Sequence, residues 1–319
     1  MELQSSLFAL DPPPVKQALT PRIAALKQEG IFIGTSSWRY EGWLGQIYTP
    51  ERYVTRGKFS KKKFHEECIH EYAELFPVVG ADFSFYGIQD ALFWKNLFSK
   101  APPDLKWSLK LPQDFTSKRF SLRAGAQSGQ PNPSFLDADL FERSFLEPLS
   151  PYLDRVSVLM AEFTSFSNAD YPEPRIFYEE LDAFLAHLPP SPRFAVELRN
   201  AEFLDADYFA MLKRNHAAHV FNSWTRMPSL SEQISIEEAY TAPFTAARAL
   251  LRPGRSYEQA VKQFSPYRSV QDEYPEGRRA ISELIDTART RKMSAYIHVN
   301  NRFEGNAIES ISASIGNIA

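Results

Sequence analysis

Charged side chains stand near the ends of several β-rich runs, which is typical of residues that share a binding or catalytic site. In FAVELR (194–199), Glu197 and Arg199 fall on one face of a strand and the apolar residues on the other, because strand side chains alternate. Charge is costly to bury beneath helices, so this face is expected to point into a barrel interior. KWSLK (106–110) has the same parity and directs Lys110 inward.

The alternation places further polar residues at the same end of other predicted strands. They are Asp82, Tyr86, Glu162, Arg248, Arg252 and Asn300. Lysine and arginine bind phosphate and carboxylate groups, and a carboxylate beside them stays ionised. The pattern predicts an anion site in which Glu197 is a base or an anchor and Lys110 and Arg199 neutralise charge. Around these three candidate catalytic residues, the predicted substrate-binding residues are Trp38, Tyr40, Tyr86, Arg248, Arg252, Asn300 and Asn301.

Other interpretations of the same residues remain open. The charges could pair with one another and plug a barrel without doing chemistry. Glu162 and Glu197 could form the carboxylate pair of a glycoside hydrolase, although the cations would then have no role. The six histidines show no metal-binding spacing, so no metal site is predicted, and the sequence identifies no cofactor.

The elements that must position these residues alternate between strand and helix. Strands are predicted at 31–36, 79–86, 106–110, 155–162, 194–199, 218–223, 246–251 and 294–300. Helices are predicted at 64–76, 89–100, 139–150, 175–188, 205–215, 257–264, 277–292 and from 306. Eight such units predict an α/β fold, a single (β/α)8 TIM-type barrel, whose active sites lie at the carboxyl ends of the strands. The runner-up, an open doubly wound sheet, lacks a glycine-rich phosphate loop.

The sequence predicts one boundary, between an N-terminal extension and the barrel domain. Residues 1–29 form a short N-terminal extension with a proline-rich start and a helix from Pro21, and residues 30–319 form the barrel. Long connections at 111–136 and 252–276 follow strands and are expected over the site.

Composition narrows the class of protein. The chain has 319 residues, a hydrophobic fraction of 44% and a net charge of −3, which disfavours a broadly basic DNA-binding surface. We expect no membrane association, because no apolar run approaches the length of a spanning helix. One cysteine and no recognisable secretory signal favour a cytoplasmic protein.

Several motifs, in order, resemble the domain of unknown function 72 family, the YecE-like proteins. The segment GTSSWRYEGWLGQIYTP (34–50) resembles the family's opening signature, and FSFYG (83–87) its Phe-Tyr after the second strand. Lys110 with Pro112 and Thr116, VELRN (196–200) and VNNRFEGNA (299–307) resemble later motifs, over roughly 31–316. Ser117 stands where the family has histidine, and MAEF (160–163) replaces a Gln-x-Pro-Pro tract. The resemblance implies a TIM-type barrel and no established reaction.

These observations lead to one principal hypothesis and one rival. The principal hypothesis is binding, with turnover left open, of an anionic, phosphate-bearing small molecule or nucleic-acid fragment at the barrel mouth. The rival is a non-catalytic protein that captures nucleic acid or a protein partner. The sequence decides neither whether the protein is an enzyme nor its oligomeric state.

Overall fold

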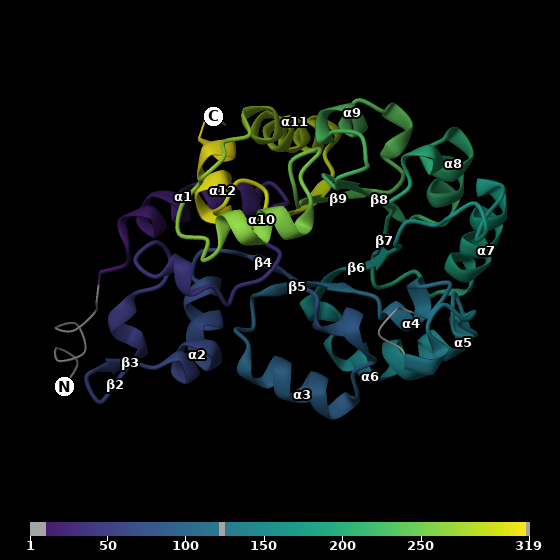
Figure 1. Cartoon of the computed structure of the whole chain (residues 1–319). Helices are drawn as coiled ribbons and strands as arrows, with labels where there is room; N and C mark the ends of the chain where they lie inside the picture. The colour runs from purple at the N-terminus through teal and green to yellow at the C-terminus, as the bar shows by residue number, and fades with distance from the viewer. Residues whose placement is uncertain (1–10, 121–124, 317–319) are drawn as a thin grey trace.

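Eight parallel strands close into a barrel at the centre of the molecule. The computed structural model describes residues 11–120 and 125–316. Around the barrel the strands follow the order β1-β10-β9-β8-β7-β6-β5-β4, which confirms the predicted TIM-type barrel. Figure 1 shows helices in a ring around these strands. The strands are β1 (Ile31–Thr35), β4 (Val78–Ala81), β5 (Lys106–Lys110), β6 (Val156–Glu162), β7 (Phe194–Glu197), β8 (Ala218–Asn222), β9 (Phe244–Ala249) and β10 (Ser294–Val299).

Helices follow most of the strands and cover the barrel. The longer ones are α1 (Pro14–Gln28), α2 (Lys61–Ala73), α3 (Ala91–Lys100), α7 (Pro174–His187), α8 (Ala206–Arg214), α10 (Tyr257–Phe264), α11 (Pro275–Arg291) and α12 (Ala307–Ile315). The short ones are α4 (Gln113–Thr116), α5 (Ala138–Phe141), α6 (Glu147–Leu149) and α9 (Leu230–Ile234). A small hairpin of β2 (Val54–Thr55) and β3 (Lys58–Phe59) precedes α2. None of the helices in the described ranges has both the length and the apolar character needed to cross a membrane.

Several elements differ from the sequence prediction. The helix expected at 139–150 is divided into α5, a π-helical turn (Glu142–Leu146) and α6, because Pro148 has no N–H for the regular ladder. The strand expected at 79–86 ends at Ala81, and a 3-10 turn (Phe83–Tyr86) follows. The sequence analysis missed α9, although the capping box of Ser229 and Glu232 marks its start.

Helix α1 starts earlier than predicted, at Pro14, and includes Pro21 in its interior. Its buried face of Leu19, Ile23 and Leu26 joins the main hydrophobic core. The ammonium group of Lys16 donates to the backbone oxygen of Glu71 on α2 at 3.2 Å. The described part of the N-terminal extension is therefore packed onto the barrel.

Side chains of the barrel interior are apolar toward the amino-terminal ends of the strands and polar toward their carboxyl-terminal ends. At the amino-terminal end, the ring of Tyr296 stacks on Phe32 at 5.1 Å and meets Phe244 edge-on at 6.3 Å. Higher up, Nε2 of His298 lies 2.8 Å from the hydroxyl of Ser108. Charged side chains occupy the carboxyl ends of the strands, as the alternation of apolar and polar residues predicts.

The seam between β1 and β4 has a single registered pair, Thr35 with Val79. A tyrosine from α2 supplements it: the hydroxyl of Tyr72 accepts from the Thr35 N–H and donates to the Val78 carbonyl, both at 3.0 Å. Gly34 leaves room for this contact, since a Cβ there would lie 2.0 Å from the Val78 oxygen. Barrel closure therefore uses a side chain where a strand ladder would normally suffice.

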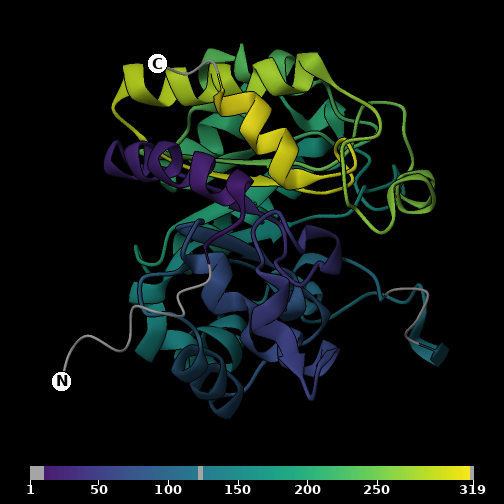
Figure 2. The same cartoon turned by 90° about the vertical axis from the view of Figure 1, so that its left-hand side faces the viewer.

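The two long connections project from one side of the barrel. Figure 2 shows α10 and the segment near 125–127 extending to the right, away from the helical ring. Both connections leave carboxyl ends of strands, β9 and β5 respectively, so they border the polar end of the interior.

Candidate functional site

A compact cluster of six charged side chains fills the mouth of the barrel. Its members are Asp82, Lys110, Glu162, Glu197, Arg199 and Arg248. They come from or directly follow β4, β5, β6, β7 and β9. Because parallel strands end at the same edge, these distant sequence positions meet in space. We call this group the mouth cluster.

Glu162 lies at the centre of the mouth cluster. The ammonium group of Lys110 is 3.0 Å from its Oε2, and Nη2 of Arg199 is 3.2 Å from the same atom. Arg248 also donates to this oxygen. Burial raises the pKa of Glu162, but the three cations outweigh that effect and hold the pKa well below its ordinary value. Glu162 is therefore ionised at neutral pH and unsuited to act as a general acid.

Glu197 is the register partner of Glu162 on the neighbouring strand and has no exposed surface. Its Oε1 is 2.6 Å from Nη2 of Arg199, and its Oε2 accepts from Nη1 of Arg248 at 2.5 Å. Burial lowers the pKa of Arg248, but Glu197 and Glu162 raise it above the ordinary value. Glu197 thus serves as a buried counter-ion for two arginines, out of reach of a solvent-borne ligand in this arrangement.

Asp82 is the member of the mouth cluster that faces water. Its side chain is 37% exposed, against 13% for Glu162 and 8% for Lys110. Its Oδ1 lies 3.0 Å from Lys110 Nζ and 3.9 Å from Nη2 of Arg248. It precedes the 3-10 turn without capping it, so no hydrogen bond to that turn fixes its side chain.

The mouth cluster is balanced in formal charge. Lys110, Arg199 and Arg248 supply three positive charges, and Asp82, Glu162 and Glu197 supply three negative ones. The cations therefore have internal partners in the absence of a ligand. An incoming anion has to replace one of the carboxylates or bring a compensating charge.

The predicted aromatic residues are spread over three places. Tyr40 packs on Trp43 and Tyr267, with ring centroids 4.8 and 5.5 Å away, and burial raises the pKa of its hydroxyl. Trp38 packs edge-on against Trp107, which points toward the helices, and so lies outside the barrel interior. Tyr86 is 69% exposed and contacts Phe85.

The two predicted asparagines are buried and already hydrogen-bonded. Oδ1 of Asn300 accepts from the N–H of Arg302 at 2.9 Å. Oδ1 of Asn301 accepts from the Trp43 indole at 3.1 Å and from the Ala307 N–H at 2.8 Å. Asn301 therefore joins the loop after β1 to the start of α12, which is a positioning role.

Arg252 lies apart from the mouth cluster. Its Nη1 pairs with Oδ1 of Asp272 at 3.0 Å, and Arg255 pairs with the other oxygen of that carboxylate. Of the ten site residues predicted, the structure brings Lys110, Glu197, Arg199 and Arg248 into the mouth cluster. Glu197 contacts both arginines, and Lys110 is joined to them through Glu162.

Sequence reasoning missed three residues that contact the mouth cluster. Oδ1 of Asn222 accepts from Arg199 at 3.4 Å, the guanidinium of Arg199 lies 4.1 Å from the Trp224 ring, and Lys110 Nζ lies 5.1 Å from the Phe85 ring. Strand parity could have found Asn222, since it follows Ala218 and Val220 on the inward face. No pattern in the sequence marks Trp224.

The described residues contain no group of three or more His, Cys, Asp or Glu that could hold a metal ion. Each carboxylate of the mouth cluster faces a lysine or arginine instead. Burial, helped by Arg248, lowers the pKa of His298 to about 3, so this imidazole is neutral at physiological pH.

The fold and the site define a single TIM-type barrel with an ion cluster at its carboxyl-terminal mouth. The model of the family described as "Protein of unknown function DUF72" matches residues 32–317, so the chain belongs to this family. This confirms the resemblance noted in the sequence. No functionally curated protein matches the chain.

Solved structures that share the fold include those of two DUF72 family proteins. A DUF72 family protein from Enterococcus faecalis aligns with a TM-score of 0.59 and 15% identity, covering 91% of this chain and 96% of its own. A DUF72 family protein from Thermotoga maritima aligns with a TM-score of 0.57 and 16% identity, covering 90% of this chain and 96% of its own.

Proposed function

We propose that the mouth of the barrel binds a small anion, with a phosphate-bearing molecule as the favoured class. The observation that carries this proposal is the convergence of three largely buried cations beside one exposed carboxylate, Asp82. Buried ion pairs stabilise a fold weakly at best compared with apolar packing, so stability alone gives little reason for such a cluster.

In this proposal the ligand takes the place of the Asp82 carboxylate. Lys110 and Arg248 already face that carboxylate from the barrel, and Asp82 lies on a turn at the surface. Displacement of Asp82 into water would let a phosphate oxygen receive charge-assisted hydrogen bonds from the two cations. Glu162 and Glu197 would stay in place and hold the cations in position.

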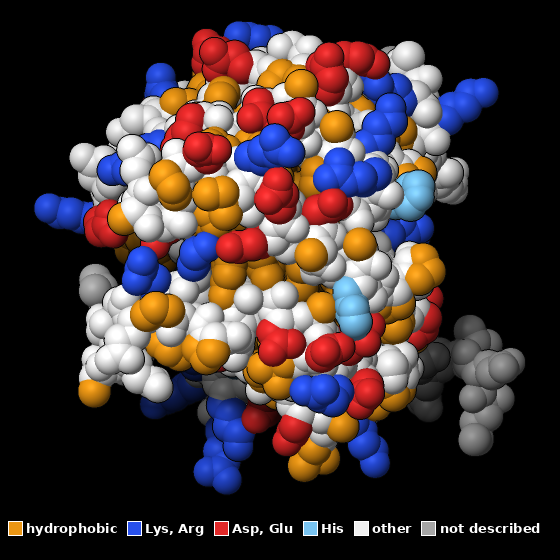
Figure 3. Space-filling model, turned by 90° about the vertical axis from the view of Figure 1, so that its right-hand side faces the viewer, with side chains coloured by type: hydrophobic (Ala, Val, Ile, Leu, Met, Phe, Trp, Pro, Cys, Tyr) orange, Lys and Arg blue, Asp and Glu red, His pale blue; other side chains and the backbone are white. Residues whose placement is uncertain are grey.

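The geometry favours this proposal over its rivals. A glycoside hydrolase needs a carboxylic acid with a raised pKa, whereas Glu162 has a lowered one and Glu197 is sealed from solvent. For capture of nucleic acid, a continuous basic surface is expected. On the face in Figure 3, acidic and basic side chains are interspersed, and the net charge of the chain is −3.

Substitution of Asp82 tests the proposal. Asp82→Asn gives the mouth cluster a net charge of +1, so the affinity for inorganic phosphate should rise several-fold, as measured by calorimetric titration at fixed ionic strength. Lys110→Met should weaken binding by about 1.5–3 kcal/mol, the typical contribution of a hydrogen bond to a charged group.

Asp104→Asn is the matched control, because Asp104 is an exposed aspartate outside the mouth cluster and its loss should not alter phosphate affinity. If Asp82→Asn and Lys110→Met both bind phosphate as the parent does, the mouth cluster is a structural plug. Turnover is assayed separately by release of phosphate from phosphate monoesters.

A further inference from the structure

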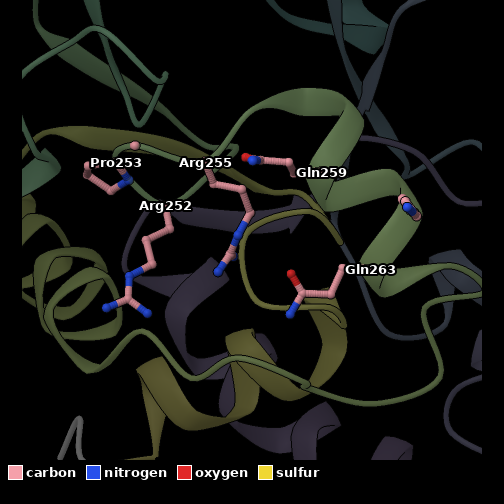
Figure 4. Close-up of a pocket in the computed structure, with 7 residues that line it drawn as sticks. Arg252, Pro253, Arg255, Gln259 and Gln263 are labelled. Atoms are coloured by element: carbon pink, nitrogen blue, oxygen red, sulfur yellow. The ribbon is translucent and has the colours of Figure 1, made fainter.

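A second group of cations surrounds an open hollow on the connection between β9 and β10. The hollow has a volume of about 610 Å³, and its lining includes Arg252, Gly254, Arg255, Gln259, Lys262 and Gln263. Figure 4 shows the guanidinium of Arg255 between Arg252 and the carboxamide of Gln263. We call this feature the basic hollow.

The local chain geometry explains why these side chains meet. A turn closed by the Arg255 N–H and the Arg252 carbonyl at 3.1 Å brings both arginines to one carboxylate, that of Asp272. Lys262 and Gln263 lie three and four positions after Gln259 on α10, so both neighbour Gln259 on the helix surface. The Thr225 hydroxyl donates to the Arg255 carbonyl at 2.9 Å and anchors the turn.

Unlike the mouth cluster, the basic hollow has excess positive charge. Arg252, Arg255 and Lys262 supply three positive charges against the single negative charge of Asp272, and Lys262 forms no ion pair within 11–120 and 125–316. Nη1 of Arg255 is buried and has no hydrogen-bond partner among the described residues. Burial and the neighbouring Arg252 both lower the pKa of Arg255, as expected where cations lack sufficient counter-charge.

The place of the basic hollow in the fold is also informative. β9 is the seventh strand of the barrel in chain order, and α10 is a short extra helix before α11. In TIM barrels generally, phosphate groups often bind at the loops after the seventh and eighth strands, beside a short extra helix. This analogy concerns only the fold, whereas the side chains themselves supply the chemistry.

We propose that the basic hollow is a second anion site, which binds the phosphate group of a small phosphate monoester through Arg255, Lys262 and Gln263. Lysine and arginine contribute charge and Gln263 a neutral donor, a set that matches the oxygens of a phosphate group. Four residues of extended chain span about 13–14 Å at most. The Cα atom of Arg252 therefore lies within that distance of the Cα atom of Arg248 in the mouth cluster. The basic hollow is nevertheless a separate site with its own cations.

Calorimetric titration of the full chain with inorganic phosphate tests this proposal. Lys262→Met and Gln263→Ala leave both Asp272 ion pairs intact. Each substitution should lower the phosphate affinity of the basic hollow about three- to tenfold. Lys95→Met, the control, removes an exposed lysine on α3 and should have no effect. Lys110→Met separates the two proposals, since it should leave the basic hollow unchanged.

Unchanged phosphate binding in both Lys262→Met and Gln263→Ala would overturn the proposal, even if Lys110→Met shows that the mouth binds phosphate. Parallel titrations distinguish the form of the ligand. Methyl phosphate should bind at least as well as inorganic phosphate if a monoester is the natural ligand. Binding of single-stranded oligonucleotides that tightens steadily with length would instead show a polyanion surface and contradict a small-molecule site.

Discussion

At the scale of single residues, the largest difference from the sequence hypothesis concerns Glu197. The sequence places it at the site as a base or an anchor, and the structure buries it beside Glu162 between two arginines. A carboxylate in this position fixes the guanidinium groups of Arg199 and Arg248 in place. Of the two glutamates, Glu162 is the one nearer to solvent, with 13% of its side chain exposed against none for Glu197.

Glu197→Gln should therefore destabilise the protein. The substitution leaves Arg199 and Arg248 without part of their buried counter-charge, and removing one partner of a buried ion pair costs about 3–5 kcal/mol. Urea unfolding measures the loss. Glu66→Gln, which removes an exposed carboxylate on α2, is the control. A loss below about 1 kcal/mol would show that water or other groups replace the charge of Glu197.

The residues of the mouth cluster were accessible to sequence reasoning because strand parity is a local property. Alternation alone directs Lys110, Glu197 and Arg248 inward. It says nothing about depth along the barrel axis, and so could not separate the sealed Glu197 from the exposed Asp82. The packing of Trp38 against Trp107 depends on the path of the loop after β1, which no periodicity encodes.

At the scale of elements, the seam between β1 and β4 shows a strand pair completed by a helix. The Tyr72 hydroxyl links the Thr35 N–H with the Val78 carbonyl. The sequence predicts that both strands exist, since their apolar runs are clear. It could not predict that their ladder would be so short, because strand register depends on the closure of the whole barrel.

Tyr72→Phe should accordingly weaken the seam. It removes one hydroxyl and leaves a buried N–H and a buried carbonyl without partners, at a cost of about 1–3 kcal/mol. Unfolding measurements give the total loss, and hydrogen exchange at the Thr35 amide should accelerate more than elsewhere in β1. Tyr152→Phe is the control, since the Tyr152 hydroxyl makes no hydrogen bond among the described residues. Equal stability and exchange in Tyr72→Phe and the parent would exclude this role.

At the scale of the whole molecule, two buried histidines link stability to pH. Burial lowers the pKa of His219 to about 4, and burial with Arg248 lowers that of His298 to about 3. Both lie below the value of 6.5 for an unperturbed histidine. Between these limits the unfolded chain binds protons that the folded chain does not, so folding is favoured at higher pH.

The contribution of these two histidines to the free energy of unfolding should therefore be constant above about pH 6.5. As the pH decreases from that value, the free energy of unfolding should fall by about 1.4 kcal/mol per pH unit for each histidine. Denaturant unfolding from pH 7.5 to 4.5 measures the slope, and His219→Leu should reduce it. His70→Gln, at an exposed histidine of α2, should leave it unchanged. An identical slope in His219→Leu would show that His219 does not contribute. The carboxylate Glu162, with its lowered pKa, adds a further loss below about pH 4.5.

The stacked rings at the amino-terminal end of the barrel affect how a ligand could travel. Phe32, Phe244 and Tyr296 fill that end, and the guanidinium of Arg193 lies 5.7 Å from the Tyr296 ring. In the described part of the chain, these rings close the amino-terminal end of the interior. A ligand bound at the mouth, as proposed, would therefore leave through the end by which it entered, the end where the connections after β5 and β9 begin. Under this proposal, ligand access and residence time would both depend on the carboxyl-terminal end of the barrel.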